Sequence, residues 1–185
     1  GVPVSGKVDF VSVVLHELAH GLAFAGTGTV SNGLGTIGFS GLPFVYDVVV
    51  VDSANTSILN QSVYPNGTAV LGNVIRGTGV SGPGLFWAGP KGIAANGGVR
   101  PRLYAPATYL QGSSFHHLDD ATYPPGTLNS LMTPSLGFAE VIHTPGGIVN
   151  GMLGDMGWGV QCSYGLSQSV AAVGAAGGAV LTTLS

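Results

Sequence analysis

The first periodic pattern along the chain predicts an amphipathic helix close to the N-terminus. Apolar residues recur at helical spacings and would form one stripe: Val11, Val14, Leu15, Leu18 and Leu22. Asp9 is a suitable N-cap, and Gly26 begins a glycine-rich loop that runs on to Gly41. Because β-branched valines lower the helix propensity here, we expect the helix to be stabilised by burying its apolar stripe in the domain.

Beyond this loop the pattern changes to short strand-like runs between turn signals. Residues 43–47 lead into a valine-rich run at 48–51, and a further short strand is expected at 103–105. Residues 112–134 are polar and typical of a loop. An amphipathic stretch at 148–156 predicts a short helix that is closed by Gly157. The order of these patterns favours the α+β class.

Composition narrows the possible function. The 185 residues suit one domain, and 45% of them are hydrophobic, 7% are charged and 32 are glycine. Five Lys and Arg residues, none adjacent, exclude the basic stripe that nucleic-acid binding needs. No apolar run approaches the roughly 20 residues of a membrane span. The single cysteine, Cys162, excludes an internal disulfide and cysteine-based zinc sites. The sparse charge and abundant Gly, Ser, Thr and Asn indicate a secreted or extracellular protein.

The most informative segment is His16-Glu17-Leu18-Ala19-His20 within the first predicted helix. Two histidines four residues apart lie on the same helical face, so both imidazoles can bind one zinc ion. Glu17 is rotated by about 100° from His16 and lies beside the metal. Its carboxylate can take a proton from zinc-bound water, whose pKa the metal lowers towards about 7. The spacing therefore predicts zinc ligands at His16 and His20 and a general base at Glu17.

A catalytic zinc needs a third protein ligand, and no histidine follows His20 closely. Spacing alone leaves His116, His117, His143 and carboxylates such as Glu140 as candidates.

Several segments together resemble the metzincin clan of zinc peptidases, most closely its leishmanolysin-like branch and bacterial secreted relatives. The active-site helix is similar over residues 16–24, and residues 112–119 resemble a "G-S-S-x-x-H-x-[DE]" stretch. Residues 129–134 look like the Met-turn of the family, and residues 153–158 are similar to an "L-x-D-[LM]-G-W" ending. The resemblance puts His117 in the third ligand position and Met132 beneath the metal.

The resemblance implies a zincin fold with an active-site helix, an inserted β-rich segment at about 41–105 and a Met-turn lower subdomain. We expect residues 1–164 to be a metallopeptidase catalytic domain and 165–185 an Ala/Gly-rich tail or linker. The strands that precede the helix in metzincins are missing, so the chain is expected to be a fragment. Family members have glycine where this chain has Ala23, which leaves Gly26 as an alternative site for the sharp turn.

The function expected from these patterns is zinc-dependent endopeptidase activity on protein or peptide substrates. Weaker hypotheses assign Asp119 to orient His117, and Tyr123 to donate a hydrogen bond to the oxyanion. Glu140 and His143 are candidates for a primed-side contact or a rival metal site, although a surface loop is the more ordinary interpretation. The alternative function is a zinc-stabilised, non-catalytic binding or adhesion module of a surface protein.

Overall fold

The computed structural model describes residues 6–159, so the predicted tail at 165–185 lies outside the described residues. Within them, helices and strands are short and alternate along the chain. The helices are α1 (Phe10–Gly21), α2 (Val45–Val48), α3 (Ala69–Ile75), α4 (Pro90–Ala95) and α5 (Gly146–Asp155). The strands are β1 (Thr29–Ser31), β2 (Leu34–Thr36), β3 (Val50–Asp52), β4 (Leu85–Trp87) and β5 (Arg102–Leu103). This mixture agrees with the α+β class, while the zincin fold stays a prediction.

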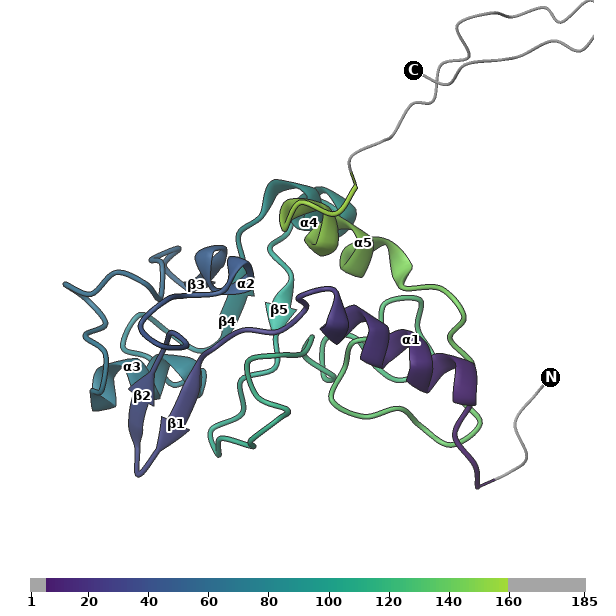
Figure 1. The fold of residues 1–185 in the computed structure, drawn as a ribbon, viewed down its shortest axis with the longest axis horizontal. Coiled ribbons are helices and arrows are strands. Elements are labelled where there is room, and N and C mark those ends of the chain that lie inside the picture. The colour runs from purple at the N-terminus through teal and green to yellow at the C-terminus, as the bar shows by residue number, and fades with distance from the viewer. Residues whose placement is uncertain (1–5, 160–185) are drawn as a thin grey trace, which may run out of the picture.

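Two small antiparallel sheets organise the chain. One is the β1–β2 hairpin, and the other has the order β3-β4-β5, with Val50 opposite Trp87 and Leu85 opposite Leu103. Figure 1 shows the hairpin on the left and α1 on the right, with a long irregular segment between β5 and α5. Helix α3 packs against the hairpin, where Gly35 and Gly72 let the two backbones approach closely.

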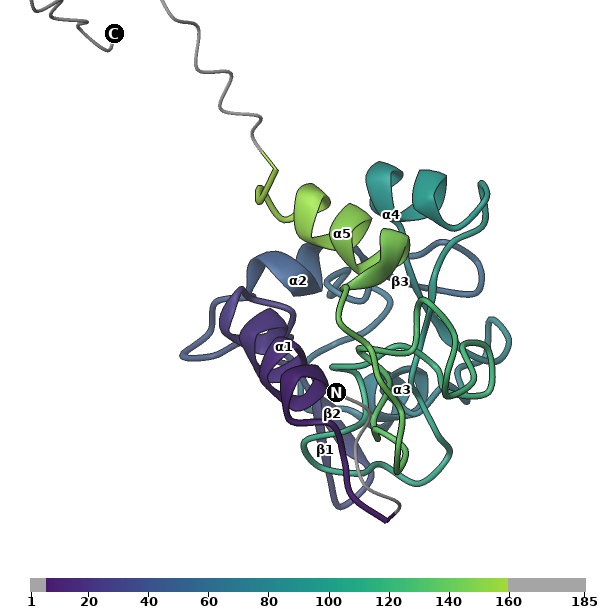
Figure 2. The same cartoon turned by 90° about the vertical axis from the view of Figure 1, so that its right-hand side faces the viewer.

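Helices α4 and α5 lie side by side in both Figure 1 and Figure 2. Asp155, at the end of α5, accepts hydrogen bonds of 2.9 Å from the backbone N–H groups of Lys91 and Gly92 and from Trp87 Nε1. Because those backbone groups belong to the first turn of α4, Asp155 caps a helix distant in sequence. Trp158, which follows α5, donates from Nε1 to the Leu22 carbonyl at 2.8 Å. This hydrogen bond connects the end of α5 to the end of α1.

Helix α1 begins where predicted, because the Asp9 side chain accepts the Ser12 N–H at 2.8 Å. Its packing differs from the prediction. Val11, Val14, Leu18 and Leu22 are each at least 37% exposed, whereas the buried face consists of Ser12, His16 and Ala19. The expected burial of the apolar stripe is therefore wrong for these four residues, while Leu15 is partly buried against the core. Helix α1 turns inward the face that carries His16.

Local predictions were partly wrong in the middle of the chain. The valine-rich run expected at 48–51 is a strand only from Val50, as β3, because residues 45–48 form α2. Asp47 accepts the N–H of Phe44 and stabilises the first turn of this helix. The segment 41–105, expected to be β-rich, holds as many helices as strands. The hairpin was missed within the supposed glycine-rich loop; its turn places Asn32 and Gly33 at φ 51° and 80°. Helix α5 confirms the helix expected at 148–156, beginning two residues earlier.

The chain turns sharply directly after α1, at Ala23. The helix ends at Gly21, and Ala23 adopts a left-handed φ of 71°. The Phe24 N–H bonds to the Ala19 carbonyl at 3.0 Å and the Ala23 N–H to the His20 carbonyl at 3.1 Å, which is the Schellman arrangement. The alternative of a turn at Gly26 is therefore wrong, and the chain accepts an alanine where glycine is usual.

This conformation predicts that Ala23→Gly stabilises the protein. A left-handed alanine is strained, so glycine should raise the free energy of unfolding by roughly 0.5–1 kcal/mol after its greater unfolded-state entropy is subtracted. Urea unfolding of the two proteins measures the difference. Ala25→Gly is the matched control, because Ala25 does not have a positive φ. Equal destabilisation by both substitutions would contradict the assignment.

Candidate metal centre

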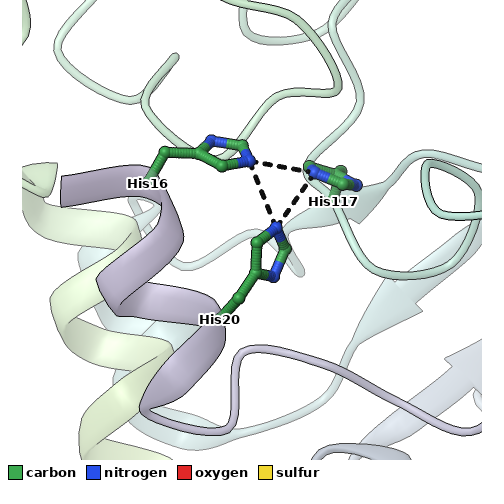
Figure 3. A group of neighbouring side chains, drawn as sticks. All are labelled: His16, His20 and His117. Atoms are coloured by element: carbon green, nitrogen blue, oxygen red, sulfur yellow. Dashed lines mark hydrogen bonds between the residues drawn. The ribbon is translucent and has the colours of Figure 1, made fainter. Parts of the chain in front are cut away.

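Helix α1 and the loop before residue 118 bring three histidine side chains together. His16 and His20 point from successive turns of α1 towards His117 on the loop (Figure 3). The Nε2 atoms are 3.1 Å apart between His16 and His20, and 3.2 Å apart between His117 and each of the other two. These three residues are the ones that the sequence predicted, and together they could hold a metal ion.

The opposite ring nitrogens determine the tautomers. Each Nδ1 atom contacts a backbone carbonyl oxygen: His16 that of Leu131 at 2.6 Å, His20 that of Phe24 at 2.7 Å and His117 that of Ser113 at 2.8 Å. Because a carbonyl oxygen only accepts, each Nδ1 must carry a proton, and a neutral ring then has a bare lone pair on Nε2. Three lone pairs therefore face one another at the centre, an arrangement that a cation stabilises.

The triangle of Nε2 atoms can be compared with the geometry of metal sites. Zinc binds imidazole nitrogen at about 2.0–2.1 Å, so two ligands of a tetrahedral site are roughly 3.3–3.4 Å apart. The observed separations of 3.1–3.2 Å are slightly shorter and nearly equal. The donor set thus fits an ion of this size without rearrangement of the backbone.

Burial keeps two of the rings neutral. His16 and His117 are 8% and 4% exposed. Burial lowers the pKa of His16 below its usual 6.5, and nearby His20 acts in the same direction. Burial and the neighbouring histidines lower the pKa of His117 to about 3, although the Ser113 carbonyl opposes this. At neutral pH both rings therefore offer unprotonated nitrogen to a metal.

Glu17 lies on the solvent side of α1, beside His16. It is exposed, and its charge acts on the pKa of His16. No hydrogen-bond donor among residues 6–159 contacts its carboxylate, so the group is available to accept a proton. A cavity of about 250 Å³ opens next to it, lined by Val8, Val13, His16, Glu17, Pro134 and Leu136.

The rival metal ligands have other partners. His116 accepts the Gly26 N–H on Nδ1 at 3.1 Å, and His143 contacts Asp9 at 2.9 Å. Glu140 is buried, and its carboxylate accepts three hydrogen bonds from nearby loops, so the surface-loop interpretation is wrong for this residue. In the part of the chain that the structure describes, the three-histidine cluster is the one grouping that could hold a metal.

Two weaker hypotheses are contradicted. Asp119 does not orient His117; it accepts hydrogen bonds from Thr122 and lies 3.5 Å from Arg102. Tyr123 is 7% exposed, and its hydroxyl accepts the Arg102 N–H at 3.4 Å, so it packs in the core. Both residues follow His117 closely in sequence, but their side chains contact Arg102 of β5.

Residues 129–134, the segment that the resemblance likens to a Met-turn (the Met-turn segment), contribute through their backbone. Leu131 and Met132 are fully buried. The Leu131 carbonyl fixes His16, and the Met132 carbonyl accepts the N–H of Leu118, the residue after His117, at 2.8 Å. Sequence reasoning missed the orienting carbonyls of Leu131, Phe24 and Ser113, because any residue type can supply a carbonyl.

Comparisons with known proteins add no family to this description. No family model, curated protein or solved structure matches the chain significantly. The resemblance noted in the motifs therefore stays a prediction. Within the described residues, no helix is both long enough and apolar enough to cross a bilayer.

The buried neutral histidines predict how the metal-free protein responds to acid. The unfolded chain binds protons with the usual histidine pKa of 6.5, whereas folded His117 does so only near 3. The contribution of the neutral His117 ring to the free energy of unfolding is therefore fully present above about pH 6.5 and is lost as the pH falls towards 3. We expect the free energy of unfolding to fall by about 1 kcal/mol or more per pH unit between pH 6 and 5.

Urea unfolding in the presence of a chelator measures this dependence. His117→Gln should reduce the slope, because it removes the buried ring whose pKa is lowered. A stability that does not change between pH 7 and 5 would contradict the buried, neutral state of the ring.

Proposed function

We propose that the protein is a zinc-dependent endopeptidase in which His16, His20 and His117 bind the metal and Glu17 is the general base. The observation that carries the proposal is the convergence of three Nε2 lone pairs. The exposed carboxylate of Glu17 follows His16 in the helix and lines the same cavity. The metal ion itself is inferred from this donor set. Imidazole suits several transition metals, and a tetrahedral spacing with one position left open favours zinc in a catalytic setting.

Zinc would supply a Lewis acid that polarises a substrate carbonyl and makes water more acidic. The protein supplies the remaining chemistry. The carbonyls of Leu131, Phe24 and Ser113 hold the three rings in position. Glu17 accepts the proton of the attacking water and passes it to the amine that leaves when the peptide bond breaks.

The cavity beside Glu17 suggests the kind of substrate. Four of its six lining residues are apolar: Val8, Val13, Pro134 and Leu136. A volume of about 250 Å³ accommodates one large side chain. We infer that the enzyme prefers a peptide with an apolar residue next to the cleaved bond, and that its substrates are proteins or peptides outside the cell.

The first test measures zinc content and casein hydrolysis together in three variants. Glu17→Gln should keep about one zinc per chain and lose hydrolysis by a factor of at least about 100, because it removes the general base and no ligand. His117→Ala should lose both zinc and activity. His143→Ala is the matched control and should keep both, since this exposed histidine contacts Asp9 and not the cluster.

Three outcomes would reject the proposal. Absence of zinc from the wild type, or zinc retained at full stoichiometry in His117→Ala, would overturn the ligand assignment. Zinc binding without hydrolysis, together with unfolding when the metal is removed, would favour the non-catalytic binding or adhesion module.

The second test concerns the cavity. Leu136→Asp places a carboxylate in its wall and should change the preference from peptides with leucine towards peptides with lysine or arginine. We expect the ratio of kcat/KM for lysine or arginine peptides to kcat/KM for leucine peptides to rise by about tenfold or more, because the new carboxylate pairs with the basic side chain. Leu128→Asp is the control, because Leu128 is 77% exposed and does not line the cavity. An identical shift in both variants would exclude this cavity as the specificity site.

A further inference from the structure

Glu140 is a buried carboxylate that the proposed chemistry does not use. It is 8% exposed and follows the Met-turn segment by several residues. Its Oε1 atom accepts the Gly126 N–H at 2.5 Å and the Ser130 hydroxyl at 2.8 Å, and its Oε2 atom accepts the Gly137 N–H at 2.6 Å. One carboxylate thereby connects three points of the loop between residues 126 and 140.

This loop carries the backbone carbonyl that holds His16 and a second carbonyl that contacts the residue after His117. Ser130, which donates to Glu140, immediately precedes Leu131, whose carbonyl fixes Nδ1 of His16. The next carbonyl along the chain, that of Met132, accepts the N–H of Leu118 beside His117. A shift of the loop would therefore move the carbonyl that contacts the His16 ring and the backbone contact next to His117.

The residues next to Glu140 form hydrogen bonds with α1 and with the segment that precedes it. The Ala139 N–H donates to the Lys7 carbonyl at 2.9 Å, and the Ile142 N–H donates to the Ser12 hydroxyl in α1 at 2.8 Å. Glu140 thus stands between α1, through its sequence neighbours, and the Met-turn segment, through its carboxylate. No other carboxylate in the described residues makes this connection.

We propose that Glu140 is a positioning residue of the metal centre, which fixes the Leu131 carbonyl relative to α1 and so sets the orientation of His16. It acts through Ser130 and the loop backbone and does not bind the metal itself. The inference rests on the metal site of the proposed function and does not depend on peptide hydrolysis. Partners that orient metal-binding histidines typically change metal affinity by about 10–100-fold when they are altered.

Glu140→Gln tests this role, because glutamine keeps the size but puts an NH₂ group where the carboxylate accepted an N–H or O–H donor. The matched control is Asp155→Asn. Asp155 also accepts three hydrogen bonds, but from N–H groups of Trp87, Lys91 and Gly92, in elements that contribute none of the three histidines. Both substitutions should lower the melting temperature of the metal-free protein.

The two variants should differ in metal binding. In competition with a chromophoric chelator, Glu140→Gln should bind Zn²⁺ at least about tenfold more weakly than the wild type, and Asp155→Asn within about threefold of it. With Co²⁺, the visible absorption bands should change in Glu140→Gln and stay unchanged in Asp155→Asn. A merely structural role would leave the bands unchanged in both.

Equal Zn²⁺ affinities for the two variants, with the same cobalt spectrum, would overturn the proposal. If Glu140→Gln fails to fold, Ser130→Ala removes one of the three donors and should weaken Zn²⁺ binding by a smaller factor, and an unchanged affinity would then overturn it. A wild type that binds neither metal removes the role of Glu140 together with the site. Tight zinc binding without hydrolysis would reject the endopeptidase and leave the role of Glu140 intact.

Discussion

The candidate site depends on one repeated interaction, in which an imidazole donates its Nδ1–H to a backbone carbonyl oxygen. The three carbonyls belong to Leu131, Phe24 and Ser113. Each bond fixes both the tautomer and the direction of its ring, so that all three Nε2 lone pairs meet at distances of 3.1–3.2 Å. Without these bonds the rings could rotate or exchange tautomers, and the convergence on one point would be lost.

The rest of the fold places those carbonyls. The left-handed turn at Ala23 brings Phe24 back towards His20, and the buried Met-turn segment brings Leu131 to His16. Helix α1 therefore buries the face with its histidines and leaves much of its apolar stripe exposed. Glu140, as we propose, connects these two supports, so that the loop and the helix keep one relative position.

The sequence predicted the parts of the site that local spacing determines. His16 and His20 follow from the helical repeat, and the cap at Asp9 follows from its residue type. His117 lies 97 residues from His20, so only the resemblance singled it out from His116. The periodicity identified an apolar stripe on α1 but could not show which face packs inward. The carbonyl partners could not be predicted, because the backbone is the same at every residue.

The central claim is that the three imidazoles bind zinc through Nε2. Zinc K-edge X-ray absorption of the loaded protein tests it most directly. We predict a first shell of nitrogen and oxygen atoms at about 2.0–2.1 Å with the outer-shell scattering of three imidazoles. A first shell without imidazole scattering would contradict the account. Zinc bound to His117→Ala with the same imidazole scattering as in the wild type would also contradict it.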